Sequence, residues 1–196
     1  MARLTLDDIA DARAYERERP AFRDRVIALK RRRRIGVGPL VTVVFENRET
    51  VRFQVQEMAR AERLLADAAI QGELDVYNPL IPGPGELSAT MFIELTSPAA
   101  LREWLPRLVG IERSVALQVG DALVRARPED AHASQLTRRE MTSAVHYLRW
   151  SVPADVLTAW PLAAVGLVID HPAYRHEAPL GEPTRAELLA DLAGGT

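Results

Sequence analysis

The chain of 196 residues contains no cysteine. This absence excludes disulfide bonds, thiolate nucleophiles, zinc ribbons and cysteine-held iron–sulfur clusters. Lysine is almost absent as well, since Lys30 is the single lysine among many arginines. We interpret this skew as a genomic bias and not as a functional signal.

Long apolar runs and a strong excess of one charge are also missing. The longest apolar stretch, 160–169, is interrupted by Pro161 and Gly166, and a membrane span needs about 20 residues. The first twenty residues are too acidic for a signal peptide. The formal charge of −2 argues against a nucleic-acid-binding protein. We therefore expect a cytoplasmic protein that does not insert into membranes.

Enough apolar residues are present for a packed core. Hydrophobic residues make up 47% of the chain and charged residues 27%, which is typical of a globular domain. Residues 5–33 predict two helical segments, with Pro20 at the start of the second. Further helices are predicted after Asn47, from Asp67 to residue 77, after Ser97 and over 153–160. The intervening alternating or β-branched segments predict strands at 40–45, 87–95, 115–119, 122–126, 143–152 and 163–169.

This order of segments lacks a regular strand–helix–strand alternation and predicts the α+β class. We expect a single domain over residues 1–177 with a helical N-terminal segment, 5–33, and a mixed core, 40–170. The core is expected to hold one mainly antiparallel sheet of about six strands, with helices mostly on one face. Residues 127–141 are expected to be irregular. Residues 178–196 are expected to form a mobile tail with one helical turn within 184–192.

The first candidate site combines His146, Asp170 and His171, with Tyr174 nearby. If the strands that carry them are neighbours, two imidazoles and a carboxylate converge. That ligand set suits a non-heme iron or a hydrolytic zinc centre, and Fe, Mn and Zn are the candidate ions. The alternative is structural: Asp170 caps a turn, His171 bonds a backbone carbonyl and His146 is a core histidine.

The second candidate is the polar run 46–49, which holds Glu46, Asn47 and Arg48, together with the glutamines and charged residues of 54–62. A diiron site needs a Glu-x-x-His pair, but Arg60 stands where that histidine would follow Glu57. The functional alternative is a pocket centred on Arg48 for an anionic ligand. In the structural alternative, Asn47 caps a helix and Glu57 pairs with Arg60 or Arg63.

The third candidate is the run of five cations that begins at Lys30 and continues through Arg31, Arg32, Arg33 and Arg34. Cations suit the end of a helix, where the backbone dipole is negative. Without interleaved aromatics, the four arginines predict a surface for an acidic protein partner. No G-x-S-x-G, P-loop or dinucleotide-binding motif is present in the sequence.

Several short motifs resemble a bacterial family, DUF3501, a domain of unknown function. They are LDDI (6–9), FENRETV (45–51), QVQEM (54–58), YNPLIP (77–82), LVGIE (108–112), TSAVH (142–146) and IDHPAY (169–174). Genes of this family tend to lie near those for rubrerythrin-type diiron proteins and an iron–sulfur oxidoreductase. The resemblance therefore implies a redox or oxidative-stress setting, and it implies no reaction.

Together these observations predict a non-catalytic accessory protein that binds partners in a cytoplasmic redox system. A rubrerythrin-like protein or an iron–sulfur oxidoreductase is the expected partner, and a homo-oligomer is compatible with the sequence. The alternative is a metal-dependent enzyme that uses His146, Asp170 and His171.

Overall fold

The computed structural model describes residues 2–129 and 140–194. Within them lie six α-helices: α1 (Ala12–Arg33), α2 (Arg48–Ala61), α3 (Asp67–Tyr77), α4 (Pro98–Arg107), α6 (Ala154–Ala159) and α7 (Glu182–Leu192). Three short 3-10 turns are η1 (Leu6–Asp8), η2 (Asn78–Leu80) and η3 (Ile111–Arg113). The chain is an α+β protein, as predicted.

The strands form two antiparallel sheets, where a single sheet was predicted. One sheet has the order β1-β2-β3-β7-β6, with bounds Arg34–Val37, Val41–Glu46, Glu86–Ile93, Val145–Ser151 and Arg127–Pro128. The other has the order β5-β4-β8-β9, with bounds Ala122–Arg125, Val115–Val119, Val165–His171 and Tyr174–Pro179. We call them sheet A and sheet B. All pairings in both sheets are antiparallel.

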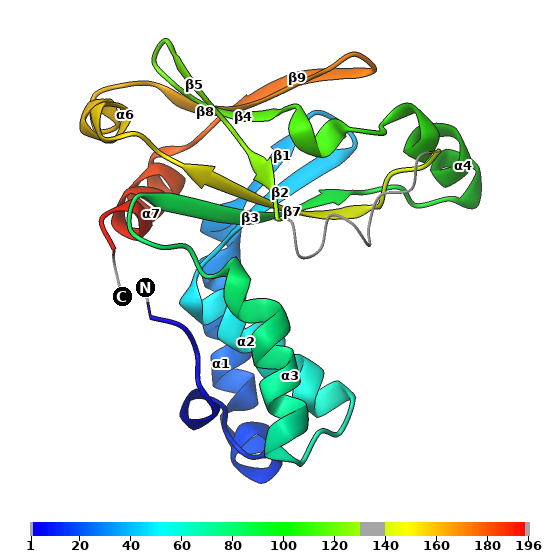
Figure 1. The fold of residues 1–196 in the computed structure, drawn as a ribbon, viewed down its shortest axis with the longest axis vertical. Helices are drawn as coiled ribbons and strands as arrows, with labels where there is room; N and C mark the ends of the chain where they lie inside the picture. Colours follow the sequence, from blue (N-terminus) through cyan, green and yellow to red (C-terminus); the bar gives the residue numbers. More distant parts are fainter. Residues whose placement is uncertain (1, 130–139, 195–196) are drawn as a thin grey trace.

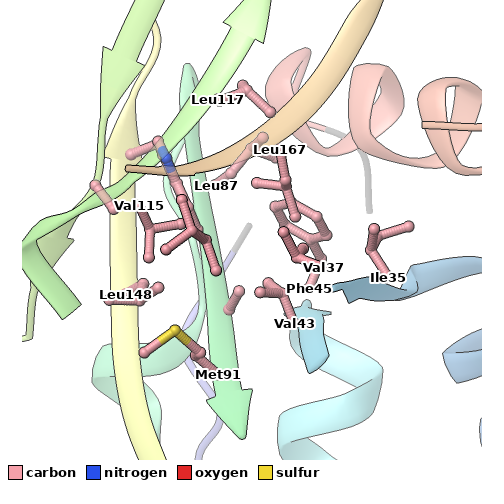
Figure 2. Packing of buried hydrophobic residues seen from close by; sticks show 14 of the residues in the cluster. Ile35, Val37, Val43, Phe45, Leu87, Met91, Val115, Leu117, Leu148 and Leu167 are labelled. Carbon is pink, nitrogen blue, oxygen red and sulfur yellow. The ribbon is translucent and has the colours of Figure 1, made fainter. Parts of the chain in front are cut away.

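The main core lies between the two sheets. Figure 2 shows Val43, Phe45 and Leu87 of sheet A gathered with Val115 and Leu167 of sheet B. Successive side chains of a strand point to opposite faces, so the alternate residues of β2, β3 and β7 point away from this core. Helices α1, α2 and α3 lie on that second side of sheet A (Figure 1). Sheet B therefore packs on one face of sheet A, and the three helices meet the other face and extend away from it (Figure 1).

Helix α1 runs without a break through Pro20, so the predicted division at this residue is wrong. A proline inside a helix costs about 3 kcal/mol because it lacks an N–H and clashes with the preceding turn. Burial of Tyr15 before it, and of Phe22 and Val26 after it, holds both halves on one axis. Tertiary packing thus overrides the local signal.

The C-terminal segment is packed and is not a detached tail. Strand β9 extends sheet B, and α7 buries Leu188 and Leu192 in the main core. The backbone N–H of Gly85 donates to the carbonyl of Leu192 over 2.9 Å. The predicted mobile tail is therefore wrong for residues 178–194, and 195–196 lie outside the described residues. Residues 130–139, which make up most of the stretch 127–141 that was predicted to be irregular, also lie outside the described residues.

Among residues 2–129 and 140–194, no helix combines the length and the apolar character that a membrane span requires.

Candidate functional site

A pocket of about 250 Å³ opens between the helices and sheet A. Its polar lining comes from Lys30, Glu46, Gln54, Tyr77, Thr90 and Tyr147. Its apolar lining comes from Val51, Leu80, Phe92 and Val145. A cavity of roughly 150 Å³ holds benzene, so this pocket has room for a ligand with more than six heavy atoms.

Strand pairing explains how these polar residues meet. Thr90 of β3 lies opposite Tyr147 of β7 on one side and opposite Val44 of β2 on the other. Glu46 is two residues beyond Val44, so its side chain shares the same face of the sheet. Lys30 reaches the pocket from the last turns of α1, and Tyr77 ends α3. Five elements, α1, β2, α3, β3 and β7, thus contribute these polar residues to one cavity.

Glu46 is the most constrained charged group of the pocket. It is 8% exposed, and its two carboxylate oxygens accept hydrogen bonds from Thr50 Oγ1 (2.5 Å) and Thr90 Oγ1 (2.7 Å). Strand β2 ends at Glu46 and α2 begins two residues later, after the cap Asn47. The junction has no loop, so the capping geometry of α2 also fixes the Glu46 side chain.

Burial raises the pKa of the Tyr147 phenol, and the neighbouring Tyr77 and the Glu46 charge raise it further. Because this phenol stays protonated at neutral pH, it can donate a hydrogen bond as well as accept one.

The three residues predicted to bind a ligand, Glu46, Asn47 and Arg48, do not lie at one site. Glu46 lines the pocket. Asn47 caps α2 by accepting from the Thr50 N–H over 3.0 Å, which confirms the structural alternative. Arg48 points away to the surface, where it bonds Asp8 Oδ1 (2.6 Å) and the carbonyl of Ala2. The prediction of an anion pocket centred on Arg48 is therefore wrong.

Glu57 pairs with Arg19 and accepts from the Tyr15 hydroxyl over 2.6 Å. The predicted pairing of Glu57 with Arg60 or Arg63 is also wrong, because α1 packs against α2 and supplies Arg19 as the partner.

The predicted metal ligands do not converge. His146 lies in β7 of sheet A, 3% exposed, and its Nε2 bonds Thr142 Oγ1 (3.0 Å) and the Ser143 carbonyl (2.9 Å). His171 lies in β8 of sheet B and bonds the Val109 carbonyl over 3.1 Å. Asp170 forms a bidentate pair with Arg125.

No group of three metal-ligating side chains forms in the described part of the chain. The structure instead agrees with the alternative for both histidines. For Asp170 it does not, because this residue lies inside a strand and caps no turn.

His146 should make stability pH-dependent. Burial lowers its pKa below 6.5, partly offset by the Glu112 charge and the Ser143 carbonyl. His146 is therefore neutral in the folded protein at pH 7. As the pH falls, this histidine takes up a proton in the unfolded chain before it does so in the folded protein. We expect the contribution of His146 to the free energy of unfolding to be full well above pH 6.5 and to fall as the pH drops through and below this value, by at most about 1.4 kcal/mol per pH unit.

Urea unfolding at pH 7.5 and pH 5.5, compared between the wild type and His146→Gln, measures this dependence. The variant should lose less stability on acidification. An equal loss in both proteins would assign the dependence to other groups.

The predicted partner surface of four arginines is only partly exposed. Arg33 is 1% exposed and bonds Asp191 and Glu187 of α7. Arg32 pairs with Glu187, and Arg34 pairs with Glu94. The prediction that Arg33 belongs to a partner-binding surface is wrong, because its charge is paired inside the fold. Arg31 is exposed and makes no ion pair with a described residue.

Sequence reasoning missed Lys30, Tyr77, Thr90 and Tyr147 as members of a site. A usable signal was present for two of them, because strand alternation places Thr90 and Tyr147 on the face opposite the core. Lys30 was hidden in the cationic run, although it is the only lysine of the chain.

The fold and the pocket define an α+β protein with a cavity between helices and a five-stranded sheet. The chain belongs to the family described as "Protein of unknown function (DUF3501)", which matches residues 3–192. This confirms the resemblance seen in the sequence.

A crystal structure titled as a novel protein of unknown function from Burkholderia pseudomallei K96243 is similar, with 36% sequence identity and a TM-score of 0.89. The match covers 97% of this chain and 100% of that one. No curated protein matches the chain.

Proposed function

We propose that the protein is a non-catalytic accessory protein that binds a small polar molecule in the pocket over sheet A. One observation carries this proposal: polar groups without partners face the same cavity. Lys30, Gln54 and Tyr77 make no hydrogen bond or ion pair with any described residue. All three residues are half-buried, so their polar groups are available to a ligand that enters the pocket, and a few convergent polar groups are what fixes a ligand in such a cavity.

The lining supports binding more than chemistry. The described residues that line the pocket include no histidine, cysteine or serine. Glu46 is the only carboxylate there, and two hydroxyl groups hold it in one position. A fixed carboxylate beside unpaired donors suits recognition, which depends on groups that need no rearrangement.

The setting that we propose for this protein rests on the resemblance seen in the sequence. The gene neighbours that the resemblance implies support a role in a cytoplasmic redox or oxidative-stress system, beside a rubrerythrin-like protein or an iron–sulfur oxidoreductase. A pull-down with this protein from its own cell extract at low salt tests the setting. If it recovers neither partner, the proposed role in a redox system is rejected, and the proposal that the pocket binds a small molecule remains.

A ligand-observed NMR screen of small polar fragments tests the binding proposal. The set should include cations, anions, zwitterions and neutral amides. Val145 lines the pocket and is half-buried, so Val145→Phe should fill it and abolish the binding seen with the wild type. The matched control is Val168→Phe, at a half-buried position in strand β8 of sheet B.

The control should bind the fragments as the wild type does. If no fragment binds, or if Val145→Phe binds as well as the control, the pocket is not a ligand site.

A further inference from the structure

We propose that the ligand is a small zwitterion, such as a free amino acid with an apolar side chain. Its ammonium group would lie against Glu46 and its carboxylate against Lys30. This inference rests on the proposed function and adds the chemical class of the ligand.

The two charged groups of the pocket have opposite signs and do not pair. Lys30 and Glu46 both line the cavity, yet they form no ion pair with each other, and Lys30 forms none with any other described residue. Three of the four arginines that follow Lys30 do form ion pairs. The Lys30 ammonium is thus a cation at the cavity whose counter-charge is missing from the described chain.

Glu46 has acceptor capacity left for a cation. An ionised carboxylate offers about four lone-pair sites, and the hydroxyl groups of Thr50 and Thr90 occupy one on each oxygen. Two sites remain for the N–H groups of a ligand. The carboxylate is already held in place, so binding requires no ordering of the Glu46 side chain.

The remaining walls favour a cation that carries an apolar group. Tyr77, Phe92 and Tyr147 contribute aromatic rings to the lining, and aromatic rings attract cations. Val51 and Leu80 are buried and aliphatic, and they offer contact for a hydrocarbon side chain. These walls also displace water, which strengthens the interaction between opposite charges.

Ligands with one charge fit less well. A simple anion at Lys30 would share the cavity with the Glu46 carboxylate, and a simple cation at Glu46 would share it with the Lys30 ammonium. Only a molecule with both charges neutralises both groups. The volume of about 250 Å³ sets the size at that of a single amino acid.

Calorimetric titration of the full chain tests the ligand class. The probes are L-leucine and L-methionine, with acetate alone and methylammonium alone as the single-charge comparisons. We expect an amino acid to bind, and both single-charge probes to bind at least about tenfold more weakly, since a hydrogen bond to a charged group contributes about 1.5–3 kcal/mol.

Variants then assign the two ends of the ligand. Lys30→Met and Glu46→Gln should each weaken amino-acid binding roughly 10- to 100-fold. Arg31→Met is the matched control, because Arg31 is the next residue of α1, is exposed and does not line the pocket. It should leave the affinity unchanged. Lys30 is only half-buried, so Lys30→Met keeps the test valid if Glu46→Gln fails to fold.

The outcomes separate this inference from the proposed function. If fragments bind in the pocket but neither amino acid does, the zwitterion is wrong and the binding function stands. If an amino acid binds and Lys30→Met has no effect, the inference is also overturned. If neither a fragment nor an amino acid binds, or if Val145→Phe binds as well as the control Val168→Phe, both proposals fall.

Discussion

Arg33→Ala should lower the free energy of unfolding by about 3–5 kcal/mol, the usual cost of removing one partner from a buried ion pair. The Arg33 guanidinium donates to both oxygens of Asp191, over 2.5 and 3.0 Å, and to Glu187 over 3.1 Å. Asp191 is only 5% exposed. Without the guanidinium, its carboxylate would remain buried next to α1 with no counter-charge.

Urea unfolding at pH 7 measures the effect. The control Arg31→Ala removes an exposed arginine two residues away and should change the free energy of unfolding by no more than about 0.5 kcal/mol. The double variant Arg33→Met/Asp191→Leu should recover most of the loss, because apolar replacements leave no buried charge. Equal effects of Arg33→Ala and Arg31→Ala would show that α7 does not depend on this ion pair.

The second large effect is expected at Tyr174, whose hydroxyl joins the two sheets. It accepts hydrogen bonds from the N–H groups of Leu40 (2.9 Å) and Val41 (3.2 Å), and it donates to the carbonyl of Val37 (2.7 Å). Tyr174→Phe leaves three backbone groups without this partner. At about 1–3 kcal/mol for each group that stays buried, we expect a loss of about 2–4 kcal/mol.

The matched control is Tyr77→Phe, which removes a half-buried hydroxyl that has no partner in the described chain. It should cost less than about 0.5 kcal/mol. Both variants are compared by urea unfolding. A loss at Tyr174 no larger than that at Tyr77 would mean that water replaces the hydroxyl in the turn between β1 and β2.

Gly38 shows how closely this turn approaches sheet B. Its φ is +72°, which favours glycine, and an added Cβ would lie 2.4 Å from His176 Cγ and 2.6 Å from the Tyr174 hydroxyl oxygen. Any side chain at Gly38 would therefore displace the group that links the sheets.

Local signals predicted most of the elements. Asn47 and Ser97 cap the helices that they were expected to cap, and Gly120 lies in the turn between the strands predicted at 115–119 and 122–126. These signals depend on a few adjacent residues, so one sequence is enough to see them. The α+β class follows from their order.

The missed features depend on contacts between distant residues. Strand β1 is a short segment that follows a helix directly, and its pairing with β2 gives it its structure. Strand β9 has three consecutive polar residues, 175–177, without apolar alternation, and its structure is defined by pairing with β8. The division into two sheets has no local signature either. The pocket was partly visible, since Glu46 was a candidate, but its other walls come from α1, α2, α3, η2, β3 and β7.

The ion pair between α1 and α7 also determines when folding can finish during synthesis. Asp191 follows Arg33 by 158 residues, and a ribosome adds about 5–20 residues per second. The nascent chain therefore carries an unneutralised Arg33 for roughly 8–30 s before its counter-charge is made. Because a buried guanidinium needs that partner, the end of α1 must stay hydrated until then. Completion of the fold is consequently a late event, set by the arrival of the C-terminal helix.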